Sequence, residues 1–459
     1  MGSSGQDNVI RLWRITFTET VGSSQNDISS LSSIVKFVTT KYIAEFKLEA
    51  VLYGHEDWVV SITWHPHSLQ LLSASADKSL IVWEQSSDKS GLWLEKARVG
   101  EVGGQASGYN GGCYSADGLT ILAVSYFGGF YAWRCEEKEP ALFKPCTVFT
   151  GHSMGVCDLD WDPSGTYLLS CSLDQTTRCF APTLKGGYAE VARPQVHGHD
   201  FSCVAFLSSS CYISGSEEKI LRVFRAPLLF AESLSKISGF PIAKVFPNPS
   251  LLAEGGALLP ALGLSNKQLE NGSSLSSSEA SKENFNVFVA PSVLTDLPTE
   301  DRLMQSTLWP EQQKLYGHGF EVYSVAVNYS GTQVASASKA SQQEHAAIIL
   351  WDTTTWKNRT TLTAHRLTVA QMEFSHDDHM LASVSRDRTF AIFIRSADDP
   401  WSWSLMYQSN TRDDVHSRII WSCSWTPDDK FLATCSRDKK VLPNKTSKYL
   451  FNFVEYSDN

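Results

Sequence analysis

Four histidines in this chain are each followed, 22 residues later, by an aspartate. The pairs are His55 and Asp77, His152 and Asp174, His365 and Asp387, and His416 and Asp438. A serine stands two residues before each aspartate, and a large aromatic residue stands six residues after three of them. The serines are Ser75, Ser172, Ser385 and Ser436; the aromatic residues are Trp83, Phe180 and Phe393, and Asn444 holds the fourth position. Such a repeated spacing indicates one structural unit used several times.

Weaker copies of this unit lie between the four strong ones. Trp133 closes a unit without His or Asp, His199 and Phe224 bracket a unit with Glu218 near its turn, Gly317-His318 leads to Trp351, and Asp7 and Trp13 form a half unit. The closing aromatic residues fall 42 to 50 residues apart wherever no insertion intervenes. This period is close to the ~40 to 45 residues of a WD-repeat propeller blade.

The segments inside each unit have the composition of short strands. Trp58 to Trp64, Leu71 to Ser75 and Ser79 to Trp83 are rich in β-branched and aromatic residues and are separated by turn residues. We therefore predict an all-β chain of WD-repeat β-propeller type, in which four-stranded blades stack radially and the closing aromatic residues pack between neighbours.

Histidine, aspartate and serine are also the residues of a catalytic triad. A triad occurs once per active site, whereas this set recurs four times at fixed spacing, so we predict a buried hydrogen-bond network that stabilises each blade. Its members are His55, Ser75, Asp77, Trp83, His152, Ser172, Asp174, Phe180, His365, Ser385, Asp387, Phe393, His416, Ser436 and Asp438. The sequence indicates no catalytic residue, cofactor site or metal site, and we predict that the chain is not an enzyme.

Other candidate sites have simpler interpretations. Gly103 to Gly112 is glycine-rich but lacks the Lys-Ser/Thr pair of a phosphate-binding loop. His65 to His67 and His376 to His379 lie where a blade turns, and we interpret them as exposed turn residues.

Charge and targeting signals narrow the class of protein. Lys and Arg number 39 against 49 Asp and Glu, a net charge of −10, which disfavours general nucleic-acid binding. Met1 to Asp7 lacks the order of a secretory signal, and Leu251 to Leu264 is too short and interrupted to span a membrane. Ten cysteines without a C-x-x-C pair indicate free thiols of an intracellular protein.

Two serine-rich stretches, Gly22 to Ser33 and Ser265 to Asn286, are expected to be mobile. The second lies in a long insertion, residues 226–313, between the unit closed by Phe224 and the one that starts at Gly317. Parts of this insertion are less polar, and Trp309 within it is either a partner contact or, as we favour, part of the internal packing.

Several runs match something narrower than a WD repeat. They are SGLWLEKARVGEVGG from Ser90, DQTTRCFAP from Asp174, PALGLSNK from Pro260, PTEDRLMQSTLWPEQQKLYGHG from Pro298, HAAIILWDTTTWK from His345 and HSRIIWSCSWTPDDKFLATCSRDKKV from His416. They closely resemble the Elongator complex subunit 2 family, and the resemblance covers nearly all of residues 1–441.

The resemblance implies a function. Members of that family have two tandem seven-bladed propellers and form a non-catalytic subunit of Elongator, which modifies wobble uridine in tRNA. It implies partners, namely the large scaffold subunit and the radical-SAM and acetyltransferase-like catalytic subunit, with indirect tRNA association. The expected location is the cytoplasm, and also the nucleus. The alternatives are a generic WD-repeat adaptor, such as a ubiquitin-ligase substrate receptor or a signalling scaffold, and a propeller enzyme.

Aligned to that layout, residues 1–140 are the last blades of a first propeller and begin inside a blade. Residues 147–441 are the first five blades of a second propeller, and residues 442–459 are a divergent tail that fits no blade, as expected of a truncated or alternatively spliced product. A rival arrangement closes the seven units after residue 53 into one ring, with Tyr42 to Leu52 as its last outer strand.

Overall fold

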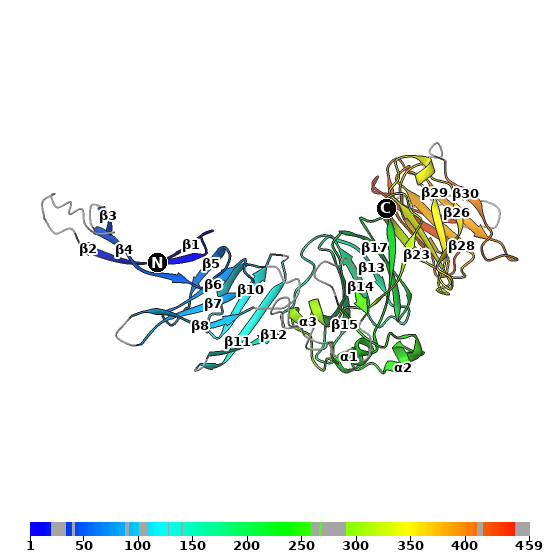
Figure 1. Cartoon of the computed structure of the whole chain (residues 1–459). Coiled ribbons are helices and arrows are strands. Elements are labelled where there is room, and N and C mark those ends of the chain that lie inside the picture. Colours follow the sequence, from blue (N-terminus) through cyan, green and yellow to red (C-terminus); the bar gives the residue numbers. More distant parts are fainter. Residues whose placement is uncertain are drawn as a thin grey trace, which may run out of the picture. The chain divides into compact units, whose positions relative to one another are not determined.

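The computed structural model describes residues 1–19, 34–38, 42–87, 91–100, 108–126, 128–138, 141–258, 266–268, 291–410 and 416–445. Within this part the chain is almost entirely β, built from antiparallel sheets of mostly consecutive strands, with a few short helices (Figure 1). The predicted all-β WD-propeller fold class is confirmed. The chain divides into two compact units: unit 1 holds Met1–Ser153 with Thr299–Asp301, and unit 2 holds most of the chain from Met154 onward.

The described residues of unit 1 form three four-stranded sheets. Their strands are β1 (Gly2–Ser4), β2 (Val9–Glu19), β4 (Tyr42–Tyr53) and β3 (Ile34–Val38); β5 (Val59–Trp64), β6 (Gln70–Ser75), β7 (Leu80–Gln85) and β8 (Trp93–Val99); and β9 (Tyr109–Tyr114), β10 (Thr120–Ser125), β11 (Phe130–Lys138) and β12 (Ala141–Cys146). Apolar layers form between consecutive sheets. Trp83 packs with Ile10 and Leu52 of the first sheet, and Trp133 packs with Leu80 and Val82 of the second, so both closing aromatic residues fill inter-sheet cores.

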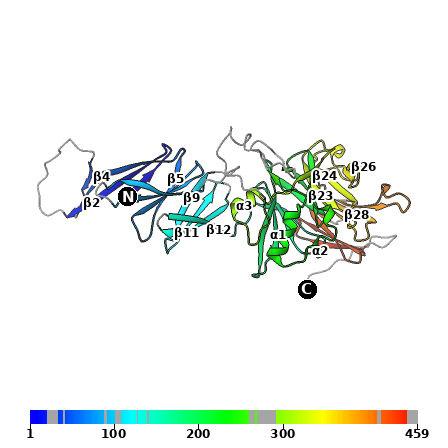
Figure 2. The same ribbon diagram turned by 60° about the horizontal axis from the view of Figure 1, so that its bottom comes forward.

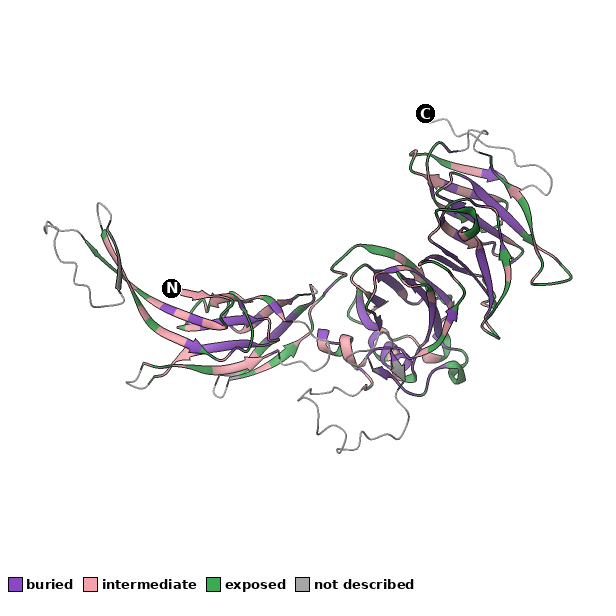
Figure 3. Cartoon of the chain, turned by 45° about the horizontal axis from the view of Figure 1, so that its top comes forward, coloured by how far each residue is buried: buried purple, intermediate pink, exposed green. Residues whose placement is uncertain are grey.

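The described residues of unit 2 form five blades. Their strands are β13 (Val156–Trp161), β14 (Leu168–Ser172), β15 (Thr176–Pro182) and β16 (Tyr188–Val196); β17 (Phe201–Ser208), β18 (Cys211–Ser216), β19 (Ile220–Arg225) and β22 (Glu311–Tyr316); β23 (Val322–Val327), β24 (Gln333–Ser338), β25 (Ile348–Asp352) and β26 (Lys357–Leu362); β27 (Val369–Phe374), β28 (Met380–Ser385), β29 (Phe390–Arg395) and β30 (Trp403–Gln408); and β31 (Ile420–Trp425), β32 (Phe431–Ser436) and β33 (Val441–Lys445). The middle strands carry most of the buried residues (Figure 3).

The insertion between β19 and β22 packs onto the second blade and its neighbour. Its described elements are α1 (Leu228–Ser238), α2 (Ile242–Val245), η1 (Pro249–Leu251), β20 (Ala257–Leu258), β21 (Lys267–Gln268) and α3 (Glu300–Gln305). Helix α1 contacts β15 and β16. It also lies beside α2 (Figure 2). Trp309 is 0% exposed and shares a core with Tyr212, Phe224 and Phe230, so it is internal packing and not a partner contact. Most of the predicted mobile stretches lie outside the described residues.

Two expectations about the chain ends need correction. The tail was predicted to leave the blade after Val441, but Val441–Lys445 is β33, which pairs along β32. Residues 446–459 lie outside the described residues. The rival single ring used Tyr42 to Leu52 as its closing strand; this segment instead belongs to β4, which pairs with β2 and β3. The assignment to parts of two seven-bladed rings stays a prediction.

Candidate functional site

A hydrogen-bonded chain crosses the blade β5–β8 from its turn to its core. His55 Nδ1 lies 2.8 Å from Asp77 Oδ2, and His55 Nε2 lies 2.7 Å from Ser73 Oγ. Trp83 Nε1 donates to the same Ser73 Oγ at 2.8 Å. Burial raises the pKa of Asp77, but hydrogen bonds from His55, Ser79 and the Glu56 amide outweigh it and hold that pKa well below its usual range.

The serine that links His to Trp is not the one the sequence predicted. Ser75, two residues before Asp77, donates to the Asp57 carbonyl at 3.0 Å and accepts from the Asp77 amide at 3.1 Å. Ser75 therefore orders the turn, while Ser73 links His55 to Trp83. A hydroxyl residue stands four positions before the aspartate in all four strong units, and this signal was available in the sequence; the residues are Ser73, Ser170, Ser383 and Thr434.

The blade β27–β30 repeats this arrangement. His365 Nε2 lies 2.8 Å from Ser383 Oγ, and His365 Nδ1 lies 3.3 Å from Asp387 Oδ2. Ser385 again accepts from the Asp387 amide at 3.1 Å. Phe393 fills the aromatic position at 2% exposure. The phenylalanine side chain has no N–H donor, so the side-chain network of this blade ends at Ser383.

In the blade β31–β33, the side-chain amide of Asn444 takes the place that the Trp83 indole has in the blade β5–β8. His416 Nδ1 and Nε2 each lie 3.0 Å from a partner, Asp438 Oδ2 and Thr434 Oγ1 respectively. Ser436 accepts from the Asp438 amide at 3.2 Å. Asn444 Nδ2 donates to Thr434 Oγ1 at 3.3 Å, as Trp83 Nε1 does to Ser73. The asparagine thus donates where Trp83 does, and β33 pairs along β32 from Val441 to Lys445.

The blade β13–β16 has a different centre. Asp174 accepts from Thr176 Oγ1 at 2.7 Å and lies 3.4 Å from Arg178 Nη2, while Ser172 accepts from the Asp174 amide at 3.1 Å. Phe180 is partly buried. His152 falls in unit 1 and Asp174 in unit 2, and their pairing stays a prediction.

Arg178 belongs to a buried ion network that the sequence did not indicate. Its Nη1 lies 3.0 Å from Glu190 Oε2, and Arg193 Nε lies 2.9 Å from Glu190 Oε1. All three side chains are at most 6% exposed. Arg193 also connects to the insertion, because its amide donates to Thr307 Oγ1 at 2.9 Å.

Two blades of unit 2 come from the weaker sequence repeats, and each has only part of the His–Asp–hydroxyl–Trp hydrogen-bond network. In β17–β22 the buried histidine is His197, not His199: His197 Nε2 lies 3.0 Å from Glu218 Oε2, whereas the His199 side chain is 43% exposed. In β23–β26, Ser336 Oγ joins His318 Nε2 and Trp351 Nε1, each at 2.7 Å. Burial lowers the pKa of His318 to about 4, so this imidazole is neutral near pH 7.

These networks are poorly suited to catalysis. Ser73 and Ser383 are both 0% exposed, and each hydroxyl already bonds to a histidine. A nucleophile must reach its substrate, and these cannot. Among the residues that the structure describes, no group of three or more His, Cys, Asp or Glu side chains could hold a metal ion. His376 of the predicted turn cluster bonds to Asp429 at 2.7 Å.

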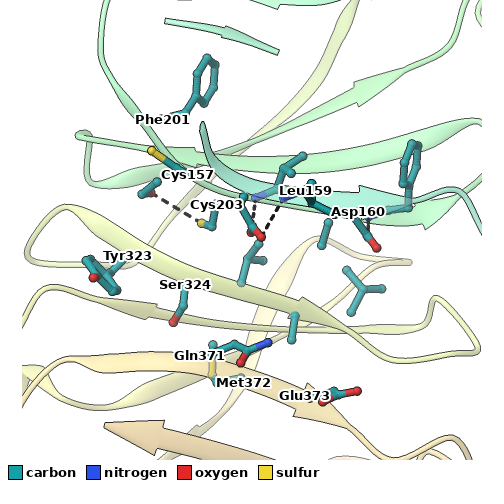
Figure 4. A pocket seen from close by; sticks show the side chains of 18 of the residues that line it. Cys157, Leu159, Asp160, Phe201, Cys203, Tyr323, Ser324, Gln371, Met372 and Glu373 are labelled. Atoms are coloured by element: carbon teal, nitrogen blue, oxygen red, sulfur yellow. Dashed lines mark hydrogen bonds between the residues drawn. The ribbon is translucent and has the colours of Figure 1, made fainter. Parts of the chain in front are cut away.

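The five first strands of unit 2 line a cavity of about 960 Å³ (Figure 4). Side-chain oxygens on the first strand of one blade accept hydrogen bonds from backbone amides on the first strand of the next blade. Asp158 accepts from the Val204 amide at 3.1 Å and Asp160 from the Phe206 amide at 2.8 Å. Gln371 and Glu373 accept in the same way from β31, at 2.7 Å from the Cys423 amide and 3.3 Å from the Trp425 amide. The channel wall thus joins successive blades.

Burial changes the protonation of these wall carboxylates. It raises the pKa of Asp158 and of Asp160 to about 6, and that of Glu373 to about 7. The lining carries four acidic side chains, Asp158, Asp160, Glu217 and Glu373, against one basic side chain, Lys339. Such a wall does not attract a phosphate backbone.

Glu373 gives a pH dependence with a defined sign. Its folded pKa of about 7 lies above the ordinary 4.5, so between these values the folded chain holds a proton that the unfolded chain has released. The free energy of unfolding therefore falls as pH rises through this window. We expect Glu373→Gln to remove roughly 1–2 kcal/mol of that fall, measured by urea denaturation from pH 5 to pH 8. The exposed Glu344→Gln is the control; equal pH slopes in E373Q and the unmodified chain would contradict the assignment.

A comparison with known protein families identifies repeats in the same parts of the sequence. The family described as "WD domain, G-beta repeat" matches residues 46–84, 143–180, 309–352, 356–393 and 409–442. The chain is 42% identical over 488 residues to Elongator complex protein 2 of Rattus norvegicus and 41% identical over 472 residues to that of Homo sapiens. It is 35% identical over 467 residues to that of Saccharomyces cerevisiae. The chain is thus similar to Elongator complex protein 2 along nearly its whole length.

This confirms the resemblance predicted from the sequence. The three alignments cover 100%, 96% and 96% of this chain but 59%, 57% and 58% of the relatives. The chain thus spans a little under three fifths of the length of these relatives. None of the helices in the described ranges is long and apolar enough to cross a membrane.

Proposed function

We propose that this chain is a non-catalytic WD-repeat subunit of the Elongator complex. The observation that carries the proposal is its 34–44% identity, over nearly its whole length, to proteins named Elongator complex protein 2. Its partners are the other Elongator subunits, the large scaffold subunit and the catalytic subunit, and its place of action is the cytoplasm, with the nucleus as a second compartment. In this role the blades supply rigid surfaces that hold these subunits together for modification of tRNA wobble uridine.

The blade interiors support a structural role. The histidine, aspartate and hydroxyl groups that recur along the sequence bond to one another inside the blades, so their chemistry stabilises the sheets. The acidic channel and the net charge of −10 favour an indirect association with tRNA, through the other subunits.

Affinity purification of the tagged chain from cells tests this proposal. We expect Elongator subunits among the co-purifying chains identified by mass spectrometry. An unrelated WD-repeat protein with the same tag is the control, because it shows which chains bind propellers in general. Recovery of no Elongator subunit, or of the same chains as with the control, would sink the proposal and favour a generic WD-repeat adaptor.

A further inference from the structure

One blade of unit 1 lacks, in its own sequence, the groups that order the turn between the second and third strands of its neighbour. In the blade β5–β8, Asp77 accepts in this turn from the Ser79 amide at 2.9 Å and from the Ser79 hydroxyl at 2.7 Å. The turn of the blade β9–β12 has the same length, because the strands on either side of it pair in a corresponding register. Phe127, which is outside the described residues, takes the position of Asp77 in the sequence, and Gly129 takes that of Ser79. This turn therefore carries neither the carboxylate nor the hydroxyl.

The glycine at position 129 is explained by space and not by its backbone. The residue before it, Gly128, has a left-handed φ of 80°, as Lys78 has (71°) at the equivalent position of the blade β5–β8. Gly129 has no left-handed φ, so its backbone conformation is open to any residue. Its neighbours exclude a side chain instead: a Cβ at Gly129 would lie 3.0 Å from Glu300 Oε1 and 3.2 Å from Ser125 Oγ.

Glu300 comes from the insertion but belongs to unit 1. It is the first residue of α3, and the segment Thr299–Asp301 is part of that unit. Glu300 is 6% exposed, and a carboxylate so deeply buried is stable only where donors or positive charges face it. In the blade β5–β8 a serine fits beside Ser75, the equivalent of Ser125. The Glu300 carboxylate is therefore the neighbour for which Gly129 leaves room.

The next residue, Asp301, extends this contact to the first strand of the blade. In the blade β5–β8, Asp77 also reaches the segment before the first strand, where it accepts from His55 Nδ1 and from the Glu56 amide. Asp301 lies close enough to Tyr109, the first residue of β9, that its negative charge adds to burial in raising the pKa of this phenol. The two carboxylates thus reach the same two parts of the blade that Asp77 joins, the turn and the start of the first strand.

We propose that Glu300 supplies, from the insertion, the acceptor that the blade β9–β12 lacks in its own sequence. The turn after β10 is then an internal site for a carboxylate side chain, held in the room left by Gly129. Ser125 Oγ accepts from the Gly129 amide at 3.1 Å, and its hydroxyl proton can donate to this carboxylate. The insertion thereby completes a blade that comes before it in the sequence. This inference goes beyond the proposed function and does not depend on Elongator membership.

Hydrogen exchange of the full chain tests the proposal with Glu300→Ala. Loss of the acceptor should raise the exchange rates of amides in β10 and β11 at least ~fivefold, because the turn that joins these strands loses a hydrogen bond to a charged group. Amides of β28 and β29 in unit 2 should exchange as before, which shows that the variant is folded. Asp296→Ala is the control, because it removes a carboxylate of the same insertion whose side chain is 78% exposed. It should leave β10 and β11 unchanged.

Gly129→Ser decides whether the carboxylate occupies this place. With Glu300 present, the new side chain meets its Oε1 and should raise the exchange rates of β10 and β11. In the Glu300→Ala background there is room for the hydroxyl that Ser79 has in the blade β5–β8, so the same substitution should raise these rates less. The proposal is overturned if E300A leaves β10 and β11 unchanged, if G129S has the same effect in both backgrounds, or if E300A raises the rates of β28 and β29 equally.

Discussion

Replacing Glu190 by alanine is expected to lower the free energy of unfolding of unit 2 by about 3–5 kcal/mol. Glu190 accepts from Arg178 Nη1 at 3.0 Å and from Arg193 Nε and Nη2 at 2.9 and 3.2 Å. The Arg178 and Arg193 side chains are only 3% and 1% exposed. The substitution would leave two buried guanidinium groups with their main counter-charge removed. Urea denaturation, read by hydrogen exchange in peptides from β15 and β16, gives the loss for this blade.

Two companion variants separate the charge from the packing. A quadruple variant, Glu190→Leu with Arg178→Met, Arg193→Met and Asp174→Asn, removes the whole buried charge cluster, including the Asp174 carboxylate that pairs with Arg178, and should recover most of the stability, because the neutral replacements need no counter-ion. The exposed Glu344→Ala should cost under ~0.5 kcal/mol. A loss below ~1 kcal/mol in E190A would mean that water reaches the two guanidinium groups, contrary to the burial described above.

The repeat period predicted the blades because it reports a contact that every blade makes. Each closing residue, such as Trp83 or Phe393, occupies the same place in the core between sheets, and selection of a large aromatic residue there is visible in the sequence. The weak units were found for the same reason. Asn444 marked a departure from this rule, yet its amide donates to Thr434 and the strand persists. Trp83 and Asn444 share a side-chain hydrogen-bond donor, whereas Trp83, Phe180 and Phe393 share an aromatic ring, so neither property alone describes this position.

The side-chain hydrogen bonds inside each blade were predicted less well. Ser73 and Ser75 lie two residues apart on β6, and both positions repeat in the other units. Spacing cannot say which hydroxyl meets the histidine ring, because residues two apart share one face of a strand. His197 and His199 pose the same ambiguity: the Gly-His signature favoured His199, but His197 is the buried one.

The ion network of Arg178, Glu190 and Arg193 gave no sequence signal. It depends on the pairing of β15 with β16 and on the insertion, whose Thr307 binds the Arg193 amide across 114 residues. Charged residues are usually solvated, so their burial follows from tertiary contacts that a repeat pattern does not encode.

Asp77→Ala is expected to destabilise unit 1 by about 2–4 kcal/mol at pH 7. Asp77 Oδ2 accepts from His55 Nδ1 at 2.8 Å and from the Glu56 amide at 2.9 Å, while Oδ1 accepts from the Ser79 amide at 2.9 Å and hydroxyl at 2.7 Å. The His55 side chain is 1% exposed, so the alanine variant leaves the buried imidazole Nδ1–H with only the Ser79 hydroxyl, 3.2 Å away, in place of a carboxylate. Hydrogen exchange in peptides from β6 and β7 measures the loss.

The pH dependence of this effect distinguishes a charged acceptor from simple packing. The folded pKa of Asp77 lies below the ordinary 3.8, so its stabilisation is present above that value and is lost as pH falls through the folded pKa. The difference between D77A and the unmodified chain should therefore be full at pH 7 and shrink below about pH 3.5. Asp57→Ala, at an exposed position in the neighbouring loop between β4 and β5, is the matched control and should cost under ~0.5 kcal/mol. Equal losses in D77A and D57A, or a difference that does not change with pH, would show that the Asp77–His55 bond does not hold this blade together.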